Sequence, residues 1–207
     1  MDSFSVNKAI IFDLDGTIWN SIPYRIRAWQ LAFKDYGMDT DPEVIRLMIG
    51  YPGSMLIKKM NAKDPEIEKT EEKYFEKMLN DVKFYPDVEE TFHELKKSGF
   101  KIAIVTSSRR NMVEKIKIKA DAIVTMDDVS SGKPDPEAYL KAIKIMGSTP
   151  SKTVVVGDID NDLIPAKKLG CIAILVDHGI QKKSENKDYE IKDIHEILGI
   201  IQSLNWK

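Results

Sequence analysis

Cysteine is nearly absent from this sequence, in which Cys171 is the single one. A lone cysteine excludes an internal disulfide, and because Cys171 begins an apolar run, we expect it to be a small buried hydrophobic side chain. Long apolar runs are also lacking, since none approaches the length needed to cross a membrane. Residues 1–8 have no apolar core of the kind found in signal peptides. We therefore expect a soluble, cytoplasmic protein with no membrane partner.

An excess of charge of one sign is missing as well. The 31 Lys and Arg residues nearly balance the 33 Asp and Glu residues, and the formal net charge is −2. Without a global basic field we expect no nucleic-acid partner, and any anionic ligand must be held locally. The three histidines, His93, His178 and His195, lack the spacing of metal ligands, so we assign them no catalytic role.

Short apolar runs are present, and helical patterns separate them from the second run onward. The predicted strands are residues 9–12, 102–105, 122–125, 154–156 and 172–176. The predicted helices are residues 87–98, 134–146, 163–169 and 193–204, and a Lys-rich solvated loop is predicted at 181–188. Strands that alternate with helices favour parallel pairing with right-handed crossovers. The sequence therefore predicts an α/β fold with a doubly wound parallel sheet.

A second folded part is expected between the first two strands. Roughly ninety residues separate them, far more than a single crossover requires. Apolar residues recur there at helical spacing: Ile22, Ile26, Trp29 and Phe33, and later Ile67, Tyr74, Met78 and Val82. The sequence predicts a core domain formed by residues 1–19 and 85–207, and a small helical domain over residues 20–84.

Two carboxylates, Asp13 and Asp15, directly follow the first predicted strand, with Gly16 and Thr17 after them. Side chains at positions i and i+2 of an extended chain point the same way, so both carboxylates can face one ligand. Like charges at that spacing repel and shift each other's pKa. A divalent cation would relieve the repulsion and leave a carboxylate free to attack phosphorus.

Three further polar stretches follow later strands, at the sheet edge where open α/β folds bind ligands. Thr106, Ser107 and Ser108 suit an anionic oxygen, although they also fit a helix cap. Lys133, in a short loop with prolines, suits a phosphoryl group or is a solvated lysine before a helix.

The third stretch is acidic and follows the strand at 154–156. Asp158, Asp160 and Asp162 place three carboxylates within five positions, more than a helix cap needs. We expect Asp158 and Asp162 at or beside a metal site. For Asp160, capping and surface roles fit equally well.

In this order, the motifs around Asp13 and Asp15, Thr106, Lys133, and Asp158 with Asp162 resemble the four motifs of the haloacid-dehalogenase-like superfamily. The resemblance extends from about residue 7 to residue 176, and the helical insert is similar to the superfamily's first class of cap domain. It implies a Rossmann-like core with a helical cap. Within the superfamily, the chain is similar to phosphoglycolate phosphatases, β-phosphoglucomutases and related small phosphatases.

The resemblance also implies roles for the first motif. Asp13 would be the nucleophile and become an aspartyl-phosphate. Asp15 would act as general acid toward the leaving alcohol and then as general base on water. Mg²⁺ would bind the Asp13 carboxylate, the Asp15 backbone carbonyl and Asp158.

The same resemblance implies that Thr106, Ser107 and Lys133 hold the phosphoryl oxygens, and that Asp162 orients Lys133 or a metal-bound water. Candidate substrate contacts in the insert are Arg25, Tyr51 and Lys58, each of which also fits an exposed helix or loop position. The chain departs from the family at Asn20 and Ile159 and in the short stretch 109–121, where a clipped helix is expected.

The resemblance implies an Mg²⁺-dependent phosphatase of small phosphorylated metabolites, acting as a monomer or homodimer. A phosphosugar mutase is the first alternative, although those enzymes usually carry His where Arg25 stands and use Arg and Lys near the loop at 48–54. A dehalogenase is disfavoured because Asp15 is present. A non-catalytic binding protein on the same fold is a further alternative.

Overall fold

The computed structural model describes residues 6–178 and 183–206. The chain divides into two compact units: Met1–Ile18 with Tyr85–Lys207, and Trp19–Phe84. This division lies one residue from the predicted boundary. Trp19 belongs with the insert because it forms an antiparallel bridge with Phe84 and packs edge-on against Phe75, with 5.6 Å between ring centroids.

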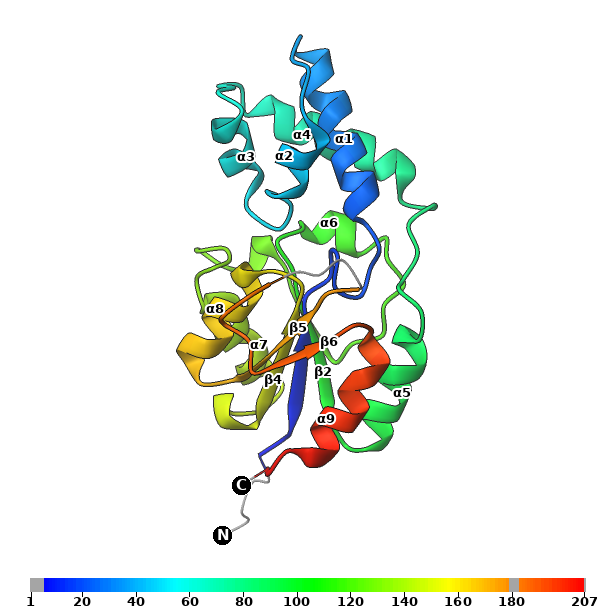
Figure 1. Ribbon diagram of the computed structural model, residues 1–207, viewed down its shortest axis with the longest axis vertical. Coiled ribbons are helices and arrows are strands. Elements are labelled where there is room, and N and C mark those ends of the chain that lie inside the picture. Colours follow the sequence, from blue (N-terminus) through cyan, green and yellow to red (C-terminus); the bar gives the residue numbers. More distant parts are fainter. Residues whose placement is uncertain (1–5, 179–182, 207) are drawn as a thin grey trace. The chain divides into compact units, whose positions relative to one another are not determined.

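The larger unit is built on a six-stranded sheet with the order β3-β2-β1-β4-β5-β6 (Figure 1). Its strands are β1 (Ala9–Phe12), β2 (Lys101–Val105), β3 (Ala122–Val124), β4 (Thr153–Gly157), β5 (Ile172–Val176) and β6 (Tyr189–Ile191). Every pair of neighbouring strands is parallel. Chain order runs outward from β1 in both directions, which confirms the predicted doubly wound α/β fold. The short edge strand β6 was not predicted.

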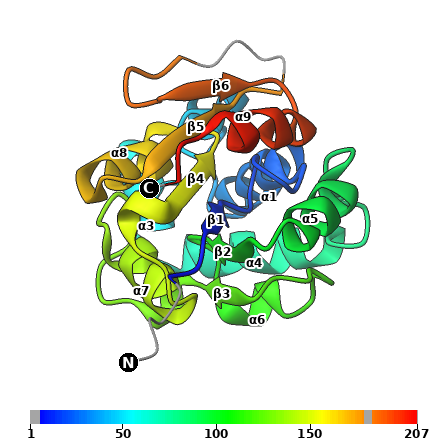
Figure 2. The ribbon, with the colours of Figure 1, turned by 90° about the horizontal axis from the view of Figure 1, so that it is seen from below.

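Helices cover both faces of this sheet (Figure 2). On one side lie α5 (Val88–Lys97) and α9 (Ile197–Ser203), and on the other lie α7 (Glu137–Ile145) and α8 (Asp160–Leu169). Because β1 is covered on both faces, all of its residues are fully buried and apolar. The helix after β2, α6 (Arg110–Val113), is four residues long, which agrees with the clipped helix expected there.

Some predicted bounds shift in the structure. The helix predicted at 134–146 begins at Glu137, after the two prolines, and the helix predicted at 163–169 begins earlier, at Asp160. The segment predicted as helix at 193–204 is a 3-10 turn, η3 (Ile194–Glu196), followed by α9. Part of the loop predicted at 181–188 lies outside the described residues, and its described part leads into β6.

Cys171 lies in the apolar layer between the sheet and the helices α7 and α8. It is a free, buried cysteine, as expected. Burial raises the pKa of its thiol to about 12. The thiol therefore stays protonated and acts as a hydrophobic group.

The insert, Trp19–Phe84, contains α1 (Ile22–Asp35), α2 (Pro42–Arg46), α3 (Gly53–Lys59) and α4 (Glu66–Met78). Its longest helices, α1 and α4, pack against each other. Their apolar faces form a separate core that includes Trp29, Phe33 and Ile67. Trp29 is therefore part of this packing, as its helical spacing indicated.

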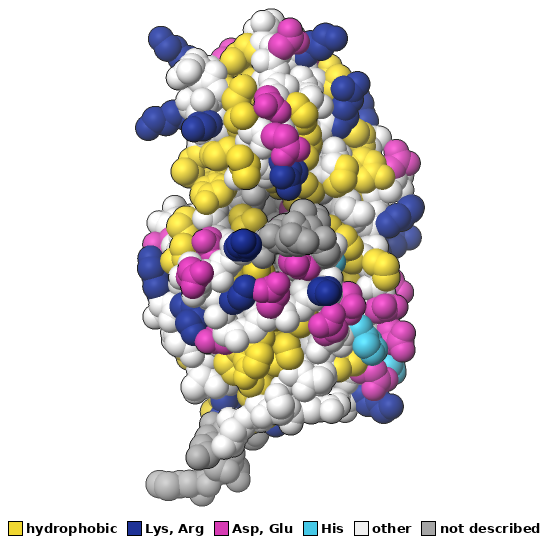
Figure 3. Space-filling view, viewed as in Figure 1, with side chains coloured by type: hydrophobic (Ala, Val, Ile, Leu, Met, Phe, Trp, Pro, Cys, Tyr) yellow, Lys and Arg dark blue, Asp and Glu magenta, His cyan; other side chains and the backbone are white. Residues whose placement is uncertain are grey.

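None of the helices in the described ranges is long and apolar enough to span a membrane. On the described residues of the face shown in Figure 3, Lys and Arg side chains are interspersed with Asp and Glu side chains. No extended basic surface covers that part of the molecule, in agreement with the balanced composition.

Candidate active site

The polar stretches that follow the core strands come together at the carboxyl edge of the sheet. Asp13 follows β1, Thr106 follows β2, Asp158 follows β4, and Asp162 lies in the first turn of α8. Lys133 lies in the loop before α7. All five side chains are buried, at 1–6% exposure. Residues far apart in the sequence therefore share one enclosed polar site.

Lys133 connects two of these carboxylates. Its Nζ lies 2.5 Å from Asp13 Oδ1 and 2.7 Å from Asp162 Oδ1. Burial alone would lower the pKa of Lys133, but the charges of Asp13 and Asp162 raise that pKa well above its ordinary value. The lysine is therefore a fixed positive charge and not the solvated side chain that was the alternative.

The charge of Lys133 does not fully compensate the negative charge and burial at Asp13. Burial raises the pKa of its carboxyl well above the ordinary range, Lys133 opposes that rise, and the charges of Asp162 and Asp158 add to it. One ammonium group faces several carboxylates at this position. A further cation would lower the electrostatic cost of keeping Asp13 ionised.

The carboxylates of Asp13, Asp158 and Asp162 can supply such a cation with ligands. Each offers one oxygen, and these oxygens lie within 4.8 Å of one another. Hard carboxylate oxygens at that spacing suit Mg²⁺. The donor set therefore fits the ion that the sequence predicts, and it includes Asp162, to which the family resemblance gave an orienting role.

Asp15 is held by the loop that follows β2. Its Oδ2 accepts a hydrogen bond of 2.8 Å from Ser108 Oγ, and Ser108 N–H in turn donates to Thr106 Oγ1 at 3.0 Å. The loop after β2 therefore holds the Asp15 side chain. Ser107, the residue predicted to bind phosphate beside Thr106, is half-buried in the same loop.

Thr17 is a site residue to which the sequence assigned no role. It is fully buried, and its hydroxyl is 3.2 Å from Asp13 Oδ2 and 3.3 Å from Asp158 Oδ1. A single hydroxyl proton shared between two carboxylates ties the ends of β1 and β4 together. Thr17 could have been identified from the sequence by its position four residues after Asp13, in the turn that carries both aspartates.

Gly157 is a second position without an assigned role. A Cβ added there would lie 2.2 Å from Asp162 Cβ and 2.6 Å from Asp162 Oδ2. Any side chain at Gly157 would collide with Asp162, which lies in the first turn of α8. Glycine at the end of β4 therefore allows Asp162 to approach the strand closely.

Asp160 and His178 lie beside the site. Asp160 Oδ1 accepts hydrogen bonds from Ser184 Oγ and Asn186 Nδ2, so it fastens a surface loop. His178 Nε2 lies 2.8 Å from the carbonyl oxygen of Thr17, and its ring stacks on Tyr85 with 3.5 Å between centroids. Burial, with the charge of Asp158, raises the pKa of Tyr85 to about 12.

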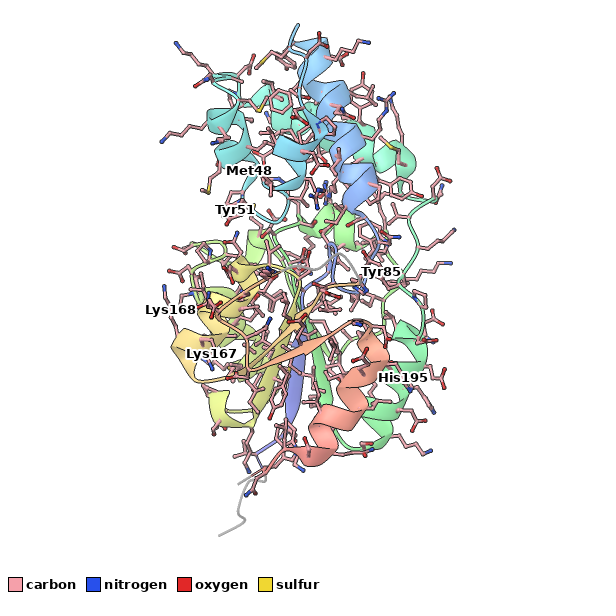
Figure 4. The ribbon with its side chains drawn as sticks, in the orientation of Figure 1. Met48, Tyr51, Tyr85, Lys167, Lys168 and His195 are labelled. Atoms are coloured by element: carbon pink, nitrogen blue, oxygen red, sulfur yellow. The ribbon has the colours of Figure 1, made fainter. Side chains whose placement is uncertain are left out.

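The other two histidines are exposed: His93 lies on α5, and His195, which is labelled in Figure 4, lies on η3. The predicted substrate contacts all belong to the insert. Tyr51 lies in the loop between α2 and α3, where Figure 4 shows it near Met48, and Lys58 is exposed on α3.

Arg25 is not the exposed helix residue that the sequence analysis gave as the alternative to a substrate contact. Its side chain is 12% exposed, and Nη1 lies 3.3 Å from Glu71 Oε1 on α4. The guanidinium carbon stands 3.7 Å above the ring of Phe75. Arg25 is therefore held within the insert, and its contact with substrate stays a prediction, as do those of Tyr51 and Lys58.

Comparisons with known proteins agree with this geometry. A family model described as haloacid dehalogenase-like hydrolase matches residues 10–176. Pyrophosphatase PpaX of Bacillus mycoides is 30% identical over 211 residues, which cover 96% of this chain and 98% of that protein. Phosphoglycolate phosphatase of Aquifex aeolicus is 30% identical over 173 residues, covering 79% and 81%. A hydrolase from Pseudomonas syringae superimposes with a TM-score of 0.85 at 25% identity, covering 96% and 99%.

Proposed function

Because the chain belongs to the haloacid dehalogenase-like hydrolase family and is a phosphatase of that family, we propose that it hydrolyses small phosphomonoester metabolites with Mg²⁺ through an aspartyl-phosphate. The observation that carries this proposal is the convergence of the carboxylates of Asp13, Asp158 and Asp162, two of which, Asp13 and Asp162, pair with Lys133. The buried carboxylates and the single ammonium group suit the transfer of a phosphoryl group, which needs both a nucleophile and fixed positive charge. A cytoplasmic location stays a prediction.

In the proposed first step, an Asp13 carboxylate oxygen attacks phosphorus, and the bond from phosphorus to the leaving alcohol breaks. The Asp15 carboxyl donates its proton to the departing oxygen, which leaves as a neutral alcohol. Ser108, which donates to Asp15 Oδ2 at 2.8 Å, holds the acid in place for this transfer. Lys133 and Thr106 bind the phosphoryl oxygens as charge moves onto them.

In the second step, water attacks the phosphorus of the Asp13 phosphate while Asp15 takes up a proton from that water. The bond from phosphorus to the Asp13 oxygen breaks, inorganic phosphate leaves and both carboxyl groups return to their starting states. Asp13, Asp158 and Asp162, with the Asp15 carbonyl that the family resemblance implies, would hold Mg²⁺. When bound, the ion supplies positive charge that neutralises the phosphoryl oxygens.

A second candidate substrate comes from the relatives. Proteins named pyrophosphatase match 94–96% of this chain at about 30% identity. Hydrolysis of pyrophosphate would use the same nucleophile and acid, with phosphate in place of the alcohol as leaving group. Inorganic pyrophosphate therefore belongs beside the phosphomonoesters in any substrate test.

The test is a substrate panel with purified protein. Sugar phosphates, phosphoglycolate, nucleotides and pyrophosphate are assayed with Mg²⁺ and with a chelator, alongside Asp13→Asn. We expect turnover that chelation abolishes and that Asp13→Asn lowers by several orders of magnitude. Metal-independent turnover would contradict the Mg²⁺ assignment. Transfer of phosphate to a second sugar hydroxyl, in place of release, would favour the mutase.

A further inference from the structure

Tyr139 is a buried polar side chain that the proposed reaction does not use. It projects from α7 and is fully buried. Its hydroxyl donates a hydrogen bond of 3.0 Å to Asp162 Oδ1, and its ring centroid lies 5.7 Å from Lys133 Nζ. A phenol in this setting either serves only to satisfy its own hydroxyl or acts on the carboxylate that it contacts.

The contacts of Asp162 are divided unequally between its two oxygens. Oδ1 accepts from both Lys133 Nζ, at 2.7 Å, and Tyr139, at 3.0 Å. Oδ2 is buried, and among the described residues no donor forms a hydrogen bond with it. A buried carboxylate oxygen without a donor is costly unless a cation or water completes it. The oxygen left open belongs to one of the carboxylates that can hold the cation.

The surroundings of Asp162 limit how far its carboxylate can turn. Lys133 and Tyr139 approach Oδ1 from the loop before α7 and from α7 itself. Gly157 lies so close that a Cβ there would come within 2.6 Å of Oδ2. Both donors contact Oδ1, and the backbone of β4 lies beside Oδ2. The Asp162 carboxylate therefore has little freedom to rotate and exchange the positions of its two oxygens.

We propose that Tyr139 is a positioning residue whose hydroxyl fixes the Asp162 carboxylate, so that Oδ1 keeps Lys133 against Asp13 while Oδ2 stays available to Mg²⁺ or its bound water. This inference rests on the proposed function and deepens it by adding a residue on α7 to the site. A carboxylate oxygen can only accept, so the Tyr139 hydroxyl is the donor in this contact.

The variant that tests this is Tyr139→Phe, which removes the hydroxyl and keeps the ring. Residues that orient metal ligands typically change metal affinity or activity by about 10–100-fold, so we expect the Kd for Mg²⁺, measured by calorimetry, to rise by about 10-fold or more. In the assay, kcat should fall by a similar factor with little change in KM, because substrate contacts remain. Added Mg²⁺ should restore part of the lost kcat.

A matched control is available in the insert. Tyr74 also donates a hydrogen bond to an aspartate, Asp35, at 2.8 Å. Tyr74→Phe therefore removes the same kind of contact away from the site, and it should leave the Kd for Mg²⁺ and kcat unchanged. If both variants lower Tm and neither changes the Kd for Mg²⁺ or kcat, Tyr139 is only structural and the proposal is overturned.

A double-mutant comparison tests whether Tyr139 acts through Asp162. If it does, Tyr139→Phe should have little further effect on kcat in an Asp162→Asn background. A double variant whose loss equals the product of the two single losses would contradict the proposal. Calorimetry distinguishes failure of the proposed function from failure of the positioning role. A wild-type protein that binds Mg²⁺ but hydrolyses no substrate contradicts the proposed function. If Tyr139→Phe then binds Mg²⁺ tenfold more weakly than this wild type, the positioning role is still supported. A wild type that binds no Mg²⁺ overturns both.

Discussion

Lys133 Nζ lies 2.5 Å from Asp13 Oδ1, although 120 residues separate the two in the chain. Both side chains are buried, so the attraction between them is weakly screened and must offset the cost of removing two charges from water. The same contact places fixed positive charge beside the proposed nucleophile. In the proposed mechanism, stability and catalysis therefore both depend on one ion pair.

Replacement of this lysine tests that dependence. Lys133→Met leaves Asp13 and Asp162 without the ammonium between them, and breaking a buried pair in this way typically costs roughly 3–5 kcal/mol. We expect a lower free energy of unfolding, measured in urea, and a loss of kcat by about 10²-fold or more. Lys69→Met, which removes an exposed ion pair with Glu66, should change stability by less than about 1 kcal/mol. Equal stability of the two variants would contradict this account.

Gly157 is expected to tolerate no side chain. Its added Cβ would lie 2.2 Å from Asp162 Cβ, so Gly157→Ala must displace Asp162 or β4. Overpacking of this kind costs roughly 1–3 kcal/mol, and kcat should fall because Lys133 moves with Asp162. Gly199→Ala in α9 meets no atom within 4 Å and should stabilise the protein by roughly 0.5–1 kcal/mol. Thermal unfolding of the pair should therefore show shifts of opposite sign.

The buried thiol of Cys171 should make the free energy of unfolding depend on pH in the alkaline range. Its thiol has a pKa of about 12 in the folded protein, raised by burial from 9.0. Above pH 9 the unfolded chain therefore loses this proton while the folded protein keeps it, and rising pH favours unfolding up to about pH 12. Cys171→Ala should lose stability less steeply than wild type when urea midpoints are compared from pH 8 upward. Parallel curves would show that burial does not hold this thiol protonated.

Arg25 allows a structural role to be separated from substrate binding. It pairs with Glu71 at 3.3 Å inside the insert, with both side chains largely buried. Arg25→Met should therefore destabilise the protein by several kcal/mol, whereas Arg46→Met, at an exposed pair with Glu43, should change stability by less than about 1 kcal/mol. Substrate contact would appear as an added rise in KM under conditions where the variant is fully folded.

The sequence predicts most of the site because of a property of parallel sheets. Polar residues that follow β1, β2 and β4 must meet at one edge, so Asp13, Thr106 and Asp158 could be grouped from the sequence alone. What the sequence did not predict are the contacts between side chains. Ser108 reaches Asp15 across 93 residues, and neighbouring Ser107 carried the same chemical signal.

Tyr139 illustrates a second reason why the site could not be predicted completely from the sequence. Among the apolar residues of α7 it fits a buried helix face, and nothing in its spacing distinguishes a core phenol from one that donates to Asp162. The boundary of the insert shows a third reason. The predicted boundary placed Trp19 in the core domain, but its bridge to Phe84 and its packing on Phe75 place it in the other unit.

The most direct test of the central claim is to find the residue that carries the phosphoryl group. The protein is mixed with a substrate identified by the panel and quenched in acid, and the acyl phosphate is reduced with borohydride, which converts a phosphorylated aspartate to homoserine. Peptide mass spectrometry should then find homoserine at position 13 in the wild type, and aspartate there in samples without substrate. An enzyme that turns over under these conditions with Asp13 unmodified, or with the label on another residue, would contradict the proposed mechanism.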